Sequence, residues 1–142
     1  MRIFKNAWFS RFADKEGITD AELRETADLL ESGQADAVAP PYGGANNPSY
    51  RQTARGTYAN LGGGVYKVRV ARSGEGKSGG YRVIVFFRSE DKTFFEYGYP
   101  KARRANIDEK ELQLFKRLAK RYLAMSDEQV TNAVKASEFI EI

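Results

Sequence analysis

The chain contains no cysteine and no histidine among its 142 residues. The absence of cysteine excludes disulfides, thiolate metal sites and cysteine nucleophiles, which suits an intracellular protein. The absence of histidine removes the usual general base at neutral pH, every Ser-His-Asp triad and the common zinc and iron ligand sets. Any acid-base chemistry must therefore run on Asp, Glu, Lys, Arg or Tyr, and we expect no metal and no other cofactor.

Long apolar runs are also missing. Residues 1–12 carry basic side chains without the apolar stretch of a signal peptide, and no later run approaches the length that spans a bilayer. These features predict a cytoplasmic protein with no membrane partner. Apolar residues make up 42% of the chain and aromatic residues 13%, which is enough for a single domain over residues 1–142 with one packed core.

Positive charge is concentrated in the middle of the chain. The net charge is +4, but residues 66–104 contain ten Lys or Arg against four acidic residues. This segment therefore carries +6, and the rest of the chain carries −2. A surface that binds a polyanion is expected to come from this central segment.

The first sixty residues predict a strand, two helices and a long loop. Residues 1–5 suit a short strand, and aromatic residues at helical spacing, Trp8 among them, predict a helix whose aromatic cluster is structural. A second helix is expected to begin after Thr19 and to end at Gly33. Residues 34–60 contain Pro, Gly and Asn without a period of 2 or 3.6. We predict a loop insertion here without secondary structure, either disordered or in contact with a partner.

Three strands and two helices are expected after this loop. The strand patterns cover residues 65–71, 81–87 and 93–99, and the polar turn before the third suits an antiparallel hairpin. Start signals at Asp108 and Ser126 predict the two helices. The last four residues are expected to dock as an extended segment. The expected order is β-α-α-β-β-β-α-α, which is an α+β fold with a three-stranded antiparallel meander.

Basic residues on two of these strands are expected to share one face of the sheet. Lys67 and Arg69 are two residues apart, and Arg82 lies on the following strand, where pairing brings it near them. The simpler interpretation is that each of these side chains points into water. The functional interpretation is that they bind an anion together.

A second basic group, with Lys101, Arg103 and Arg104, comes just before a helix start. Positive charge is unfavourable at the positive end of the helix dipole, which favours a function for these residues. Tyr97 and Tyr99 beside them suit either stacking on a nucleobase or packing in the core.

A glycine-rich stretch, residues 71–78, has the pattern of a relaxed P-loop. A P-loop must open directly into a helix whose N-terminal amides bind the phosphate, whereas this stretch leads into the strand pattern of residues 81–87. ATP or GTP hydrolysis is therefore rejected. The stretch suits a hairpin connection that carries Arg72 and Lys77, either as a mobile solvated loop or as a cationic loop that approaches phosphates closely.

Three runs of sequence resemble the RelE/HigB family of bacterial toxins, in the subgroup with a glycine-rich β-hairpin loop. The longest is residues 62–88, GGGVYKVRVARSGEGKSGGYRVIVFFR, and the match continues through residues 97–108, YGYPKARRANID. The N-terminal run RIFKNAWFSRFA resembles the opening of the same subgroup. The resemblance covers nearly everything outside the loop insertion.

This resemblance implies a RelE-like fold with the β-α-α-β-β-β order and an activity that cleaves mRNA in the ribosomal A site. It implies a metal-free reaction in which a ribose 2′-hydroxyl attacks the neighbouring phosphate, which suits a chain without His or Cys. It also implies a cognate antitoxin, expected to be a HigA-like helix-turn-helix protein. That antitoxin would inhibit the toxin, and the toxin would be linked to operator DNA only through it.

Carried onto this sequence, the resemblance assigns roles to basic residues. Arg69 and Arg82 would give Lys67 the cationic neighbours that a lysine base needs, and their guanidinium groups would stabilise the charge of the phosphorane. Many relatives carry Arg or Asn where this chain has Ala102. The acid for the leaving group, or a contact to a base, is therefore either missing or supplied by Arg103 or Arg104. The implied catalytic residues are Lys67, Arg69, Arg82 and Arg104, and the implied RNA-binding residues are Arg72, Lys77, Lys101, Arg103 and Tyr99.

Two alternatives stay open at this point. A toxin that inhibits gyrase, like the ParE proteins, would use the same fold without a catalytic cluster of cations. A non-catalytic RNA-binding module, with its chemistry lost at position 102, would bind RNA with a strong salt dependence and would leave it intact.

Overall fold

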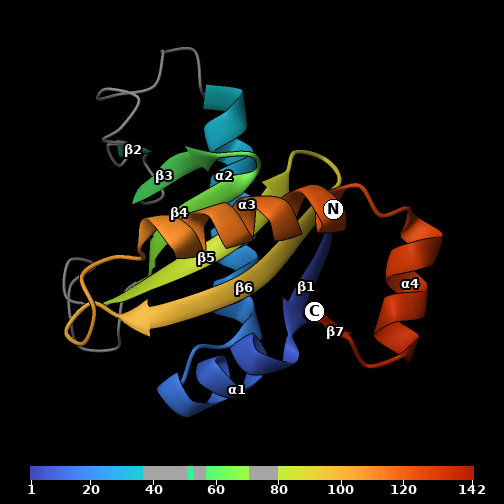
Figure 1. The fold of residues 1–142 in the computed structure, drawn as a ribbon, viewed down its shortest axis with the longest axis horizontal. Helices are drawn as coiled ribbons and strands as arrows, with labels where there is room; N and C mark the ends of the chain where they lie inside the picture. Colours follow the sequence, from blue (N-terminus) through green and yellow to red (C-terminus); the bar gives the residue numbers. More distant parts are fainter. Residues whose placement is uncertain (37–50, 53–56, 71–79) are drawn as a thin grey trace.

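The computed structural model of the chain describes residues 1–36, 51–52, 57–70 and 80–142. Within these residues, seven strands form one sheet in the order β2-β3-β4-β5-β6-β1-β7, with helices on both faces (Figure 1). The elements are β1 (Arg2–Asn6), α1 (Ala7–Glu16), α2 (Asp20–Asp36), β2 (Arg51–Gln52), β3 (Thr57–Gly62), β4 (Val65–Val70), β5 (Tyr81–Arg88), β6 (Lys92–Pro100), α3 (Glu109–Leu123), α4 (Asp127–Lys135) and β7 (Phe139–Glu141).

The expected α+β fold is confirmed, and its centre is the antiparallel meander of β4, β5 and β6. The strand β1 pairs with β6 in parallel, and the long connection that such a pair needs is supplied by the elements from α1 to β5. The strand β7 pairs antiparallel with β1, so the expected docking of the C-terminal segment is confirmed. No helix in the described part of the chain combines the length and the apolar character that crossing a bilayer requires.

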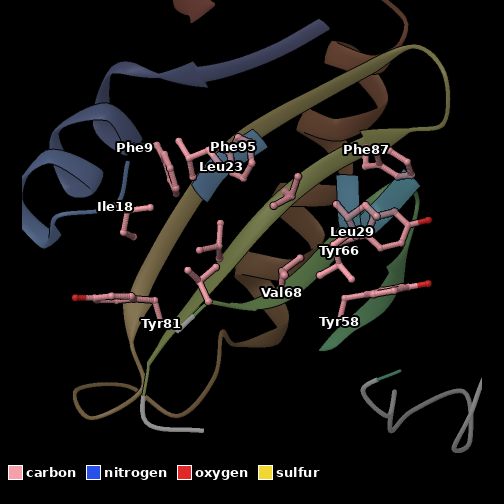
Figure 2. Close-up of a cluster of buried hydrophobic side chains, with 14 of the residues drawn as sticks. Phe9, Ile18, Leu23, Leu29, Tyr58, Tyr66, Val68, Tyr81, Phe87 and Phe95 are labelled. Carbon is pink, nitrogen blue, oxygen red and sulfur yellow. The ribbon is translucent and has the colours of Figure 1, made fainter. Parts of the chain in front are cut away.

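The sheet separates two apolar cores. The first core lies between the sheet and the helices α1 and α2, where Phe9 and Leu23 lie beside Phe95 of β6 (Figure 2). Val68 and Val83 of the neighbouring strands belong to the same core. The second core lies on the opposite face, under α3, which crosses the front of the sheet in Figure 1, and under α4. Both faces of the central strand β5 are therefore covered, as its mixed apolar sequence predicts.

The start signals of the C-terminal helices are confirmed. Asp108 caps α3 with a complete capping box. The Asp108 side chain accepts a hydrogen bond from the backbone N–H of Glu111, and the Glu111 side chain accepts one from the backbone N–H of Asp108. Ser126 and Gln129 form the same arrangement at α4. These motifs depend on residues three positions apart, which is why the sequence alone locates them.

Two expectations for residues 33–60 are wrong. The helix α2 continues through Gly33 to Asp36, and residues 57–62 form β3, which pairs with β4. The reason for the glycine is tertiary: a Cβ at Gly33 would lie 2.7 Å from Cε1 of the Tyr58 ring. Gly33 therefore lets β3 approach α2, and it does not end the helix. Residues 37–50 and 53–56 lie outside the described residues.

This close approach predicts the effect of Gly33→Ala. An unhindered change from glycine to alanine inside a helix stabilises by about 0.5–1 kcal/mol, but overlap with the Tyr58 ring should instead destabilise the protein by about 1–3 kcal/mol. In a Tyr58→Ala background the added methyl group should be neutral or stabilising. Urea unfolding of all four proteins, followed by circular dichroism, measures the coupling. An equal cost in both backgrounds would contradict the role assigned to the Tyr58 ring.

Candidate functional site

The register of the meander places the basic residues of β4 and β5 on one face. Arg69 lies opposite Arg82, and Arg82 lies opposite Tyr99, so the three form a row across three strands. Lys67 stands two residues from Arg69 and lies opposite Ile84, which belongs to the second core. The basic side chains therefore share the face that α3 covers, as the alternation along the strands predicts.

These basic residues are buried, so the interpretation that they point into water is wrong for at least two of them. Lys67 is 8% exposed and Arg82 is 2% exposed, and Arg69 is partly buried. The Lys67 Nζ donates a 3.0 Å hydrogen bond to Asn106 Oδ1. Positive charges placed side by side in this way favour the binding of an anion.

Asn106 connects the strands to the segment that leads into α3. Its side-chain oxygen accepts from Lys67 and, at 2.9 Å, from the backbone of Ile107, and its backbone oxygen accepts a 2.9 Å bond from Nε of Arg104. One residue thus fixes the position of two of the basic side chains implied to be catalytic. Sequence reasoning missed Asn106, because no motif marks a residue whose role depends on contact with a strand 39 positions away.

Arg104 turns toward the cluster and is held by a carboxylate and two rings. It forms an ion pair with Glu111, donates a 3.2 Å bond to the Tyr97 hydroxyl, and lies 5.9 Å and 5.6 Å from the ring centroids of Tyr97 and Tyr99. The hydrogen bond from Arg104 is the main cause of the lowered pKa of Glu111, followed by the backbone bond from Asp108. The same pairing raises the pKa of Arg104, so this guanidinium stays charged.

The other predicted RNA-binding residues have different positions. Lys101 and Arg103 are exposed in the turn after β6. Tyr99 is 3% exposed, so its ring is packed and offers no open face to a base, whereas Tyr97 is half-buried. Arg72 and Lys77 lie outside the described residues.

The arrangement of this cluster, formed by Lys67, Arg69, Arg82 and Arg104 with Asn106, suits a phosphodiester better than a metal. Within the described residues, no group of three or more carboxylate, His or Cys side chains is placed to hold a metal ion. Guanidinium and ammonium groups donate several charge-assisted hydrogen bonds to phosphate oxygens. The buried cations can therefore bind a phosphate and stabilise additional negative charge on it.

The comparison with protein families agrees with the geometry. The family model described as the RelE toxin of the RelE/RelB toxin-antitoxin system matches residues 1–45 and 49–142. No curated protein and no solved structure matches the chain.

The ion pair at Arg104 predicts how stability depends on pH. Glu111→Gln keeps an acceptor for the α3 cap but removes the charge, and both side chains are about 30% exposed. We expect a loss of about 0.5–1 kcal/mol at pH 7. Because folding lowers the pKa of Glu111, its contribution is present above the unfolded value of about 4.3 and is lost as the pH falls through the folded value.

The measurement is urea unfolding of both proteins between pH 7 and pH 3. The control is Glu109→Gln, which removes a carboxylate from the same helical turn without touching Arg104 and should have a smaller effect at pH 7. A difference between the native protein and Glu111→Gln that stays constant down to pH 3 would contradict the role of the ion pair.

Proposed function

The chain belongs to the RelE toxin family of toxin-antitoxin systems, and from this premise we propose that it is a ribosome-dependent endoribonuclease that cleaves mRNA without a metal ion. The observation that carries the proposal is the buried row of cations on β4 and β5, with Lys67 and Arg82 less than 10% exposed. Several positive charges that share one face of a sheet favour the binding of a polyanion such as RNA.

The proposed reaction begins at the ribose 2′-hydroxyl. Lys67 acts as the general base that accepts the hydroxyl proton, with its Nζ oriented by Asn106. The 2′-oxygen attacks the adjacent phosphorus, and the bond to the 5′-oxygen of the next nucleotide breaks. The departing 5′-oxygen takes up a proton from solvent, so the products are a 2′,3′-cyclic phosphate and a 5′-hydroxyl end, and no metal or cofactor enters this step.

The arginines act on the charge that develops during this attack. Arg69 and Arg82 lie opposite each other across β4 and β5, where both guanidinium groups can donate to the non-bridging oxygens of one phosphate. Arg104 approaches from the segment after β6 and would donate a hydrogen bond to the departing 5′-oxygen, which stabilises the charge that develops there. In this proposal Arg104, and not the exposed Arg103, takes over the function that Ala102 cannot provide.

Membership of the family implies a cognate antitoxin. We propose that this antitoxin is a HigA-like helix-turn-helix protein, that it covers the cation cluster, and that only it contacts operator DNA. The substrate would be mRNA in the ribosomal A site, which places the activity in the cytoplasm. Acidic antitoxin side chains would compete with RNA phosphates for the same guanidinium groups.

The proposal predicts that charge removal within the cluster abolishes cleavage. Arg82→Met should lower the rate of cleavage on programmed ribosomes by about 100- to 1,000-fold, and Lys67→Met by about 100- to 10,000-fold. Methionine fills the buried space, so the fold should persist. Primer extension maps the new ends, and ribosome-free RNA tests whether the ribosome is required.

The matched control is Lys120→Met, which removes one positive charge from the exposed side of α3 and should cleave normally. Circular dichroism confirms that each variant is folded. A folded native protein that arrests growth without cutting mRNA, and whose toxicity survives Arg82→Met, would contradict the proposal and would indicate a protein target such as gyrase. Salt-dependent RNA binding without cuts would indicate a non-catalytic module.

A further inference from the structure

A recess lies beside the cation cluster, between α1 and the end of β6. Its volume is about 410 Å³, within the range of pockets that bind small ligands. Tyr97 and Arg104 both line the recess. Arg104 belongs to the cation cluster and donates a hydrogen bond to Tyr97, so the two sites are adjacent. The wall on the α1 side is formed by Trp8, Phe12 and the side chains of the last turn of the helix.

Trp8 is the main aromatic surface of this recess. It is 41% exposed, although the sequence places it in a structural cluster. Its ring stacks on Phe12 at 5.4 Å and on Tyr97 at 4.7 Å between centroids. Two-fifths of the residue stays accessible in spite of both contacts, so the accessible part of the indole can contact an occupant of the recess. Large exposed aromatic surface is unfavourable in water unless a ligand covers it.

The rim of the recess carries positive charge. Arg11, Lys15 and Arg103 are exposed, and within the described residues none of the three forms an ion pair. The one acidic residue of the lining is Glu16, whose carboxylate accepts a 3.0 Å hydrogen bond from the Tyr81 hydroxyl. An occupant of this recess should therefore combine a planar apolar group with negative charge on either side of it.

We propose that this recess binds a nucleobase of single-stranded RNA, packed against the accessible part of Trp8, with Arg11, Lys15 and Arg103 contacting the flanking phosphates. The inference rests on the proposed function, because it takes the RNA to be the strand whose phosphate lies in the cation cluster. Bases stack on aromatic side chains in most proteins that bind single strands, and the neighbouring cations follow the backbone. The recess thus holds the nucleotide next to the one that is cut.

The single tryptophan of the chain makes the proposal directly measurable. The probe is an eight-nucleotide RNA with 2′-O-methyl groups throughout, which no 2′-hydroxyl chemistry can cleave. We expect saturable quenching of the Trp8 fluorescence as this RNA is added to the purified protein. In Trp8→Leu, binding followed by anisotropy of a labelled copy should be about 5- to 150-fold weaker.

Two further variants separate stacking from a general loss of structure. Trp8→Phe keeps an aromatic face and should retain most of the affinity. The matched control is Leu114→Ala, which truncates another exposed apolar residue, on α3, and should bind RNA normally. Replacing both Arg11 and Lys15 by Gln should flatten the dependence of log K on log salt by about 0.7 for each phosphate contact removed.

The outcomes distinguish this inference from the proposed function. RNA binding that depends on Trp8, in a protein that does not cut mRNA, supports the recess and overturns the nuclease. Normal cutting together with RNA binding that is unchanged in Trp8→Leu overturns the recess and leaves the nuclease. Quenching by the antitoxin but not by RNA also overturns the inference, and it would identify the recess as a protein-binding surface.

Discussion

The alternation of side chains along β4 and β5 is the constraint on which the rest of the structure depends. Tyr66 and Val68 face the first core, and Lys67 and Arg69 face the side of α3. A slip of one residue in the pairing with β5 would exchange the two sets, placing cations against α1 and α2. The apolar residues of the first core therefore fix the register, and the register places the candidate site.

The face under α3 is divided between a core and a polar cluster. Phe86 and Phe115 pack together in the second core, while Lys67 contacts Asn106, just before the cap of the helix. Because α3 begins only at Glu109, it leaves this end of the sheet to the loop that carries Arg104. The capping box at Asp108 thus decides where apolar packing ends and where a site of buried cations can form.

The features that could be predicted from the sequence are those set by neighbouring residues. The strand alternation that groups Lys67 with Arg69, and the cap at Asp108, depend on spacings of two and three positions. The features that could not be predicted depend on distant contacts. The continuation of α2 through Gly33 depends on Tyr58, and the exposure of Trp8 depends on where α1 meets β6.

The choice between Arg103 and Arg104 was likewise open, because adjacent residues in a loop have no fixed direction until the fold supplies partners. Glu111 is such a partner, because its carboxylate accepts a hydrogen bond from Arg104. The same carboxylate also accepts a hydrogen bond from the backbone N–H of Asp108. Under the proposed function, a phosphate would compete with Glu111 for the Arg104 guanidinium. Glu111 would keep its backbone bond during that exchange, so no carboxylate would be left without a donor. The ion pair can therefore hold Arg104 in place before the substrate binds. Breaking it when the phosphate binds costs little free energy.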